Sequence, residues 1–516
     1  MDRTGWRWCL VLQLLAWGWA QAAPVMTGDG ALAGRRQNGV EVYRGVPFAL
    51  PPLGAWRWRP PQPVPTWRGV RDAGKFAPAC MQQGVSMPGE SPPVVSEDCL
   101  YLNLWAPPRH AGRRLPVIVW IHGGGYANGS ASMPLYHGDR LARKGVVVVT
   151  VAYRLGALGF LAHPALSAES PHRSSGNYGL MDQIAALEWV RRNIAAFGGD
   201  PDRVTIAGQS AGAMAVSALL ASPRARGLFQ RAIAQSGGIF EPLQLAPGYL
   251  LANAERDGAN YMDALGATTL EAMRMLPADR LTVPGAVTHP VIEPNLLPLS
   301  PYDAYVQGRY HDVPLLLGSN SEEARALVDV TAVRADRFEA DIGKSVGALP
   351  PALLAAYPHA TDQQARDSRL ALERDLRFGW DMWAWARLAQ AGRSPVYYYS
   401  FEQRPPFPPD SVHAGWGASH FAELWYMFDH LGQAPWTWRG ADRKLAEAMS
   451  NYWVRFAGTG DPNGGDMPRW PPFQGAAGQV QRLGDPISTG PVPALDSLQA
   501  FDAVYAGLRG KAFGVP

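Results

Sequence analysis

The hydrophobic pattern of the chain alternates between short, unbroken apolar runs and longer segments of helical periodicity. Runs rich in β-branched residues at 115–121, 146–152 and 204–207 predict strands that are buried on both faces, as in a parallel sheet. Residues 182–197 place apolar side chains at helical spacing and end at a Gly-Gly pair, which predicts a helix. This order of strand, helix and strand indicates a mostly parallel sheet with helices on both faces.

Shorter elements extend this predicted sheet in both directions. An alternation of valines between residues 40 and 46 predicts an edge hairpin, which prolines then end. The last clear strand covers residues 396–400, and the last predicted helix covers 442–456. Further strands are expected at residues 100–105, 232–237 and 313–318.

Two long stretches outside the predicted sheet are expected to shape a substrate site. Residues 240–312 have broken helical patterning and many prolines, and we interpret them as an insertion over the carboxyl edge of the sheet. Residues 325–390 form the second stretch, in which the aromatic helix 375–388 is interpreted as core, with pocket lining as the alternative. Because no repeat or low-complexity linker divides the chain, we expect a single domain over residues 23–516.

The N-terminus has the features of a secretory signal. Arg3 and Arg7 precede an apolar stretch from Cys9 to Trp19, and Ala20-Gln21-Ala22 supplies a cleavage site of small residues. We therefore expect residues 1–22 to be a signal peptide and the mature protein to be periplasmic or secreted. The alternative is a buried N-terminal helix.

Composition indicates which kinds of molecule this protein can bind and which it does not. The chain is 47% apolar and 18% charged, as in globular proteins, and its formal net charge is +3. Because this charge is small and the basic residues are scattered, we expect no nucleic-acid partner. We also expect no stable membrane insertion, since no apolar run after the N-terminal segment is long enough to span a bilayer. Removal of Cys9 with the signal leaves Cys80 and Cys99, an even pair that indicates one disulfide in an exported protein.

The stretch from Val204 to Gly212 carries the strongest chemical signal. A β-branched run breaks into Gly208-Gln209-Ser210-Ala211-Gly212 and then into small residues, which is the strand, sharp turn and helix of a nucleophile elbow. Ser210 would be exposed on the turn as a nucleophile, and the N–H of Ala211 would begin a helix, where partial positive charge favours an anion. The alternative is a glycine-rich turn that happens to contain a serine.

A second glycine-rich stretch, His122-Gly123-Gly124-Gly125-Tyr126, follows the predicted strand 115–121. Consecutive glycines leave several backbone N–H groups free to converge on one point, as a developing oxyanion requires. A flexible loop would have the same composition, but its pairing with a nucleophile elbow favours the oxyanion interpretation.

A serine nucleophile needs a histidine as base and an acid that orients the histidine. In folds with a nucleophile elbow, the nucleophile comes first in the chain, then the acid, then the base. Glu323, at the end of a predicted strand, and a later histidine fit this order. Four histidines follow Glu323 in the chain, and two of them, His359 and His430, are interpreted as surface or core residues. His413 and His420 lie in one glycine-rich loop, and spacing alone does not separate them.

These motifs resemble those of the type-B carboxylesterases, the family of α/β-hydrolases that includes the cholinesterases and many bacterial esterases. The resemblance covers nearly the whole mature length and implies an α/β-hydrolase fold with long insertions over the carboxyl edge of the sheet. The matching segments are residues 44–49, 97–103, 122–126, 153–156, 176–183, 197–201, 208–212, 417–420 and 456–463.

By this resemblance Ser210 is the nucleophile, Glu323 the acid and His420 the base, because the family's histidine precedes a glutamate as His420 precedes Glu423. Ser236 matches a second serine near the triad and is expected to hydrogen-bond the acid. The other implied features are oxyanion N–H donors at Gly124, Gly125 and Ala211, a disulfide between Cys80 and Cys99, and buried ion pairs of Arg44 with Glu97 and of Arg154 with Asp182.

Two departures from the family pattern bear on function. Ala324 stands where the family usually has glycine after the acid, and the neighbouring Glu322 remains a second candidate for the acid. Residues 81–98 contain no aromatic residue, whereas cholinesterases resemble one another in carrying a tryptophan there that binds a quaternary ammonium. This difference argues against choline esters.

We therefore expect an exported serine carboxylesterase that acts on small-molecule esters through an acyl-enzyme, with no metal and no organic cofactor. One alternative is a specialised hydrolase for a bulky ester, such as a polyester, an aryl ester or a toxin. The other is a non-catalytic binding protein, as the neuroligins resemble this family without acting as esterases. The sequence does not determine the natural substrate or the oligomeric state.

Overall fold

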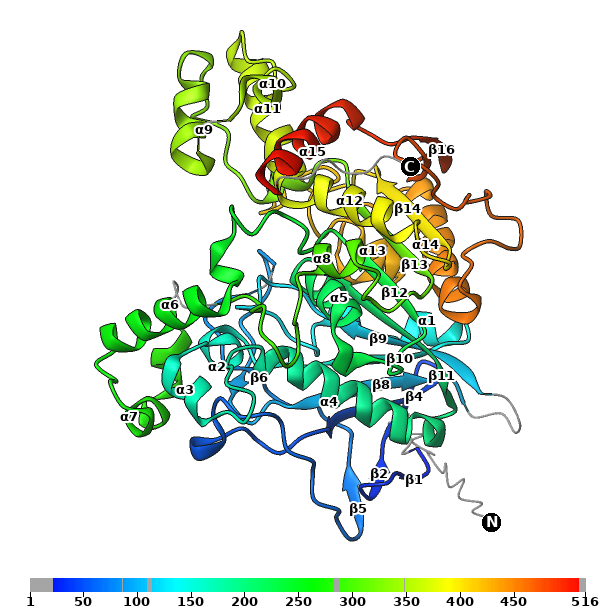
Figure 1. The fold of residues 1–516 in the computed structure, drawn as a ribbon. Coiled ribbons are helices and arrows are strands. Elements are labelled where there is room, and N and C mark those ends of the chain that lie inside the picture. Colours follow the sequence, from blue (N-terminus) through cyan, green and yellow to red (C-terminus); the bar gives the residue numbers. More distant parts are fainter. Residues whose placement is uncertain (1–21, 86, 109–113, 283–287, 348, 510–516) are drawn as a thin grey trace, which may run out of the picture.

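The computed structural model describes residues 22–85, 87–108, 114–282, 288–347 and 349–509. The predicted signal peptide therefore lies outside the described residues, except for Ala22. Within them, an eleven-stranded sheet runs through the centre of the molecule in the order β16-β15-β14-β13-β12-β11-β9-β10-β8-β4-β3 (Figure 1). None of the described helices combines the length and apolar character that crossing a bilayer requires.

The middle of this sheet is parallel, as the unbroken apolar runs predict. β9 (Leu115–Ile121) lies between β10 (Val147–Val151) and β11 (Gly199–Gln209) and pairs in parallel with both. The parallel part continues through β12 (Arg231–Gln235), β13 (Leu315–Asn320), β14 (Val396–Phe401) and β15 (Gln479–Leu483).

Antiparallel strands close both ends of the sheet. β14 confirms the strand predicted at residues 396–400, but two further strands that the sequence did not predict, β15 and β16, follow it. β15 contains only two apolar residues, Val480 and Leu483, among three polar ones, so it lacks the continuous apolar run by which the central strands are recognised. The antiparallel strands are β16 (Ser488–Pro491) at one end, and β8 (Tyr101–Ala106), β4 (Val40–Pro47) and β3 (Arg35–Gln37) at the other.

Alternate side chains of β9 pack against helices on opposite faces of the sheet. Val119 belongs to the core that includes α4 (Tyr178–Asn193) and α5 (Ala211–Ala221). The next residue, Trp120, belongs to a separate core under α14 (Gly440–Thr459). The predicted arrangement of a mostly parallel sheet between two helical layers is confirmed.

The two predicted insertions carry helices of their own. Figure 1 shows α6 and α7 beside α2 and α3, and α9, α10 and α11 gathered on the side where α15 lies. Trp380, Trp383 and Trp385 of α12 are fully buried, as the core interpretation expects. The helices are α2 (Gly156–Phe160), α3 (Pro164–Glu169), α6 (Leu251–Ala264), α7 (Leu270–Met275), α8 (Pro301–Val306), α9 (Phe338–Val346), α10 (Pro351–Leu354), α11 (Asp362–Arg374), α12 (Trp380–Ala389) and α15 (Leu495–Arg509).

Shorter elements complete the described chain. They are α1 (Asp139–Arg143), α13 (Leu424–Met427), a small sheet of β1 (Val25–Met26), β2 (Ala31–Ala33) and β5 (Val70–Asp72), and the pair β6 (Ala79–Cys80) and β7 (Val95–Ser96).

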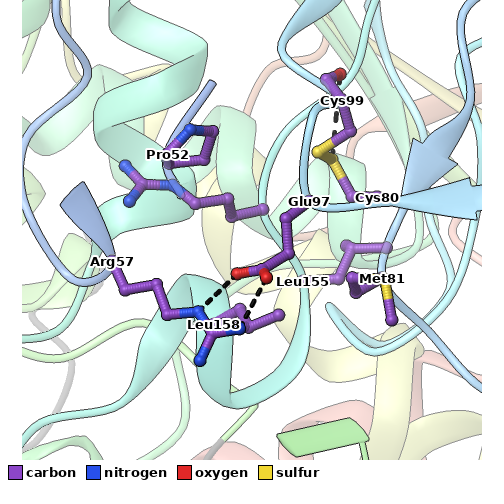
Figure 2. A pocket seen from close by; sticks show the side chains of 9 residues that line it. Pro52, Arg57, Cys80, Met81, Glu97, Cys99, Leu155 and Leu158 are labelled. Atoms are coloured by element: carbon purple, nitrogen blue, oxygen red, sulfur yellow. Dashed lines mark hydrogen bonds and ion pairs between the residues drawn. A yellow bond between two sulfur atoms is a disulfide. The ribbon is translucent and has the colours of Figure 1, made fainter. Parts of the chain in front are cut away.

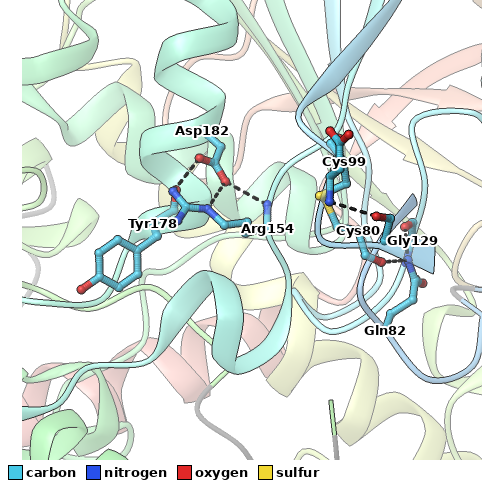
Figure 3. The surroundings of a disulfide bond; sticks show 9 residues. Cys80, Gln82, Cys99, Gly129, Arg154, Tyr178 and Asp182 are labelled. Carbon is cyan, nitrogen blue, oxygen red and sulfur yellow. Dashed lines mark hydrogen bonds and ion pairs between the residues drawn. A yellow bond between two sulfur atoms is a disulfide. The ribbon is translucent and has the colours of Figure 1, made fainter. Parts of the chain in front are cut away.

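The predicted disulfide between Cys80 and Cys99 is present and lies close to a glycine-rich loop that follows β9 (Figure 3). Just after Cys80, the side chain of Gln82 donates to the carbonyl of Gly129 and accepts from its N–H, both at 2.8 Å. The disulfide loop therefore holds the end of the loop that contains Gly124 and Gly125.

One of the two expected ion pairs differs from the prediction. The buried pair of Arg154 with Asp182 is present, with both N–O contacts at 2.8 Å (Figure 3). Glu97, however, pairs with Arg57 rather than Arg44, because Arg57 occupies both carboxylate oxygens at 2.6 Å (Figure 2). The Arg44 guanidinium instead lies over the ring of Phe76, 4.8 Å from its centroid.

Replacing Cys80 and Cys99 together by serine should lower the free energy of unfolding by about 3 kcal/mol, since the bond closes a loop between residues 19 positions apart. Urea unfolding of the variant and the wild type without reductant measures this difference. Adding reductant to the wild type should reproduce most of the loss, and two identical unfolding curves would contradict the prediction.

Candidate active site

Ser210 occupies a sharp turn between β11 and α5, with φ 57° and ψ −127°. This conformation is strained for a residue with a side chain and persists only where the surrounding structure enforces it. A Cβ at Gly208 would lie 2.4 Å from the carbonyl of Gly212, and a Cβ at Gly212 would lie 2.1 Å from the oxygen of Ile121. Both positions therefore require glycine, as the sequence predicts.

Ser210 lines a cleft of about 690 Å³ together with His420, Gly124 and Gly125. This volume is in the usual range of small-molecule sites. As expected, both insertions supply walls of the cleft. Their apolar contributions include Leu245 from the first and Leu327, Leu376 and Phe378 from the second.

His420 is held by contacts on several sides. Its Nδ1 atom lies 2.6 Å from Oε2 of Glu323, and both side chains are buried. The other carboxylate oxygen of Glu323 accepts the backbone N–H of Asn320 at 2.7 Å. The ring of Phe378 stacks on the imidazole, with centroids 4.5 Å apart. A proton on Nδ1 is thus directed at the carboxylate, which leaves Nε2 as the basic atom.

Gln209, which directly precedes Ser210, also contacts this imidazole. Its fully buried amide nitrogen lies 3.2 Å from Nε2 of His420, within hydrogen-bond distance. The sequence argument gave Gln209 no role beyond its place in the elbow motif. Its position next to the nucleophile was the available signal.

The other three candidate histidines have different surroundings. His413 stacks on Phe407, with centroids 5.3 Å apart, and lines a neighbouring cleft. His430 lies 3.2 Å from Asp139, and His359 lies 3.3 Å from Glu339. Of the four, His420 is the one that contacts Glu323.

Glu322 has partners other than the imidazole of His420. Its carboxylate forms two contacts of 2.8 Å with Arg404 and one of 2.8 Å with Arg325. It also accepts the backbone N–H of Ala418 at 2.9 Å. These partners occupy the carboxylate, so Glu323 is the member of the pair that is placed against His420.

The glycine-rich loop adopts a backbone shape that glycine favours. Gly124 and Gly125 have φ values of 107° and 62°. The carbonyl of Gly124 accepts the N–H groups of Ala127 at 3.1 Å and Asn128 at 2.9 Å, which tightens the turn beside the cleft. Ala211 is the first residue of α5, so its N–H lies at the positive end of an eleven-residue helix.

The expected hydrogen bond from Ser236 to the acid is not observed. The Ser236 hydroxyl is buried and has no hydrogen-bond partner among the described residues. The carboxylate oxygens of Glu323 are already occupied, one by Asn320 and the other by His420.

A second buried carboxyl group, that of Glu423, lies beside the site. Burial, and then the neighbouring charge of Glu323, raise its pKa to about 7. The side chains of Asn320 and Gln235 donate to it at 2.6 Å and 3.1 Å. The sequence argument used Glu423 only to identify His420, because its burial depends on residues distant in the chain.

Glu423 should make the free energy of unfolding depend on pH. Its pKa is higher in the folded state than the usual 4.5, so folding favours the protonated form and its contribution is lost as pH rises through about 7. Between pH 5 and pH 8, Glu423→Gln should therefore gain about 2 to 3 kcal/mol of stability relative to the wild type. Urea unfolding at both pH values measures this, and a constant difference would contradict it.

Among the described residues, no group of three or more histidine, cysteine, aspartate or glutamate side chains is arranged to hold a metal ion. The chemistry visible in the cleft is that of a partly buried serine, a buried histidine and carboxylate pair, and backbone N–H groups.

Comparison with known proteins agrees with this geometry. A profile of the Carboxylesterase family matches residues 21–491. The chain is 37% identical over 497 residues to the fumonisin B1 esterase of Sphingopyxis macrogoltabida, an alignment that covers 91% of this chain and 90% of that protein. It is 35% identical over 470 residues to the para-nitrobenzyl esterase of Bacillus subtilis (strain 168), with 87% and 92% covered.

Solved structures give the same result. A PNB esterase superposes with a TM-score of 0.79 at 33% identity, covering 92% of this chain and 99% of the other. The carboxylesterase Est55 of Geobacillus stearothermophilus superposes with a TM-score of 0.80 at 33% identity and the same coverage. The chain therefore belongs to the carboxylesterase family of α/β-hydrolases and is a carboxylic ester hydrolase.

Proposed function

We propose that this protein is an exported serine carboxylesterase with a triad of Ser210, His420 and Glu323. The observation that carries the proposal is the 2.6 Å contact between His420 and Glu323, in a cleft that Ser210 also lines. A serine on a strained turn, a histidine and a buried acid are the parts that acyl transfer requires. A binding protein on this scaffold would not need them.

In this mechanism the Ser210 hydroxyl attacks the ester carbonyl carbon while Nε2 of His420 takes its proton. The N–H groups of Gly124, Gly125 and Ala211 stabilise the negative oxygen of the tetrahedral intermediate. Collapse of the intermediate releases the alcohol, which receives the proton from His420, and leaves an acyl-enzyme. Water then repeats the two steps and releases the acid.

Glu323 acts on the imidazole rather than on the substrate. Its carboxylate holds the proton on Nδ1 and stabilises the imidazolium that forms during each step. Phe378 covers one face of the ring, which limits the orientations that the ring can adopt.

The proposal includes export. A signal peptide over residues 1–22 would direct the chain out of the cytoplasm and leave residues 23–516 as a single catalytic domain. The disulfide between Cys80 and Cys99 supports an oxidising compartment, the periplasm or the exterior.

Two measurements test the proposal: the rates of hydrolysis of p-nitrophenyl esters from acetate to palmitate, and mass spectrometry of the protein after it has been mixed with such an ester. We expect turnover and an acyl adduct on the peptide that contains Ser210. A folded protein with no turnover would instead support the binding-protein alternative or a hydrolase for a more specialised ester. The preferred chain length would measure the depth of the acyl pocket.

A further inference from the structure

A second cleft, with a volume of about 580 Å³, lies beside the catalytic cleft, and none of the triad residues lines it. This volume is in the usual range of small-molecule sites. Val85 and Pro88, which lie in the loop between Cys80 and Cys99, line both clefts. The two clefts therefore adjoin each other at the disulfide loop.

Part of the lining of the second cleft is aromatic. Trp425 and Trp436 line it with their ring centroids 4.9 Å apart, and the imidazole of His413 lies 5.3 Å from the ring of Trp436. Phe407 stacks on His413 and packs edge-on against Trp436, with centroids 4.8 Å apart in the second contact. Trp436 is only partly buried, so its ring can pack against an aromatic ring of a ligand.

Three apolar side chains that line the second cleft pack in one cluster with a residue of the catalytic cleft. The three are Met87, Met133 and Leu135. The residue of the catalytic cleft is Phe421, which follows His420 and whose ring centroid lies 4.3 Å from that of the imidazole. One set of packed apolar side chains therefore connects the histidine side of the catalytic cleft with the second cleft.

The alcohol part of an ester substrate belongs on this histidine side. In the proposed mechanism, Nε2 of His420 gives its proton to the oxygen of the leaving alcohol, so this oxygen must lie beside the imidazole. The acyl part stays bonded to Ser210 after the alcohol has left. A long alcohol chain can therefore extend toward the second cleft while the acyl chain occupies the catalytic cleft.

Hydrogen bonds hold part of the second cleft in shape. Gly124 and Gly125 line the catalytic cleft, and the same loop continues to Gly129, which lines the second cleft. Gln82 also lines the second cleft, and its side chain forms two hydrogen bonds of 2.8 Å with the backbone of Gly129 (Figure 3). A site that is formed in this way before the ligand arrives costs less conformational entropy on binding.

We propose that the second cleft binds the alcohol part of the substrate, so that esters of long alcohols ending in an aromatic ring are preferred. This inference rests on the proposed function, because it takes the Ser210 cleft as the place of reaction. The recognising rings are His413, Trp425 and Trp436. The disulfide loop, which contains no aromatic residue between positions 81 and 98, contributes apolar side chains instead.

Two isomeric esters test the proposal, because they differ only in which side of the ester carries the ring. The ring is on the alcohol in 4-phenylbutyl butyrate and on the acid in butyl 4-phenylbutyrate. Relative to butyl butyrate, 4-phenylbutyl butyrate should have a kcat/KM about tenfold higher, since burial of a ring against an aromatic wall is worth about that factor. Butyl 4-phenylbutyrate should gain less.

Variants of Trp436 show whether the aromatic wall causes this advantage. Trp436→Leu removes the ring but keeps an apolar side chain, so the advantage of 4-phenylbutyl butyrate over butyl butyrate should fall toward one, with kcat/KM for butyl butyrate within a few-fold of the wild type. Trp436→Phe keeps a ring and should retain most of the advantage. Trp56 is 43% exposed and lines neither cleft, so Trp56→Leu is the control variant with an unchanged ratio.

Equal kcat/KM for 4-phenylbutyl butyrate and butyl butyrate in the wild type would overturn the proposal, as would an unchanged advantage in Trp436→Leu. If Trp436→Leu fails to fold, the two isomers still decide in the wild type, because an equal gain from a ring on either side would contradict binding of the alcohol part.

A binding measurement separates this inference from the proposed function. In thermal unfolding of Ser210→Ala, 4-phenylbutan-1-ol should stabilise the protein more than butan-1-ol does at the same concentration. Absent ester hydrolysis with an intact thermal shift would mark failure of the proposed function, whereas hydrolysis without a preference for the ring on the alcohol would mark failure of this inference.

Discussion

Ser210→Ala should lower kcat/KM for p-nitrophenyl butyrate by at least about 10⁴-fold, because acyl transfer then has no nucleophile. Alanine keeps the Cβ that the turn at φ 57° already accommodates, so the backbone strain at this position is unchanged. The helix that follows keeps its first backbone hydrogen bond, from the N–H of Met214 to the carbonyl of residue 210. The loss of activity should therefore occur in a folded protein.

Initial rates of the two purified proteins, with circular dichroism and thermal unfolding as controls for folding, measure this effect. Ser236→Ala is the matched control, since the Ser236 hydroxyl is buried and has no hydrogen-bond partner among the described residues. It should retain activity within a few-fold. If Ser210→Ala kept more than a tenth of the wild-type activity, Ser210 would not be the nucleophile.

The residues at the elbow illustrate what a sequence can predict. The turn at Ser210 depends on Gly208 and Gly212, because a side chain at either position would collide with the backbone where strand and helix meet. Both glycines are close to Ser210 in the chain, so a local sequence pattern is enough to predict the turn. The unbroken runs of β9 and β10 likewise predict central strands, because both faces of a parallel sheet are buried.

Contacts between distant residues could not be predicted in the same way. Glu97 takes Arg57 as its partner across 40 positions, and no local pattern distinguishes Arg57 from Arg44. Spacing left His413 and His420 equivalent, and the contact with Glu323 separates them only in three dimensions. The resemblance to a family supplied the choice of His420, whereas it suggested a role for Ser236 that the packing of this chain does not provide.

The acid of the triad can be tested with two adjacent glutamates. Glu323→Gln should lower kcat/KM by about 10³- to 10⁴-fold, because the wrong tautomer of His420 is then favoured. The N–H of Asn320 holds one side-chain oxygen at 2.7 Å, so the new amide nitrogen would take the position of Oε2 and donate to Nδ1. The proton would then lie on Nε2, which could no longer accept the proton of Ser210.

Glu322→Gln is the matched comparison, since it removes the same charge one residue earlier. Glu322 contacts Arg404 and Arg325, whose side chains are 68% and 38% exposed, so solvent screens these ion pairs and their loss should matter little. Its activity on p-nitrophenyl butyrate should stay within a few-fold of the wild type. A larger loss in Glu322→Gln than in Glu323→Gln would reverse the assignment of the acid, and equal small losses would show that neither carboxylate orients His420.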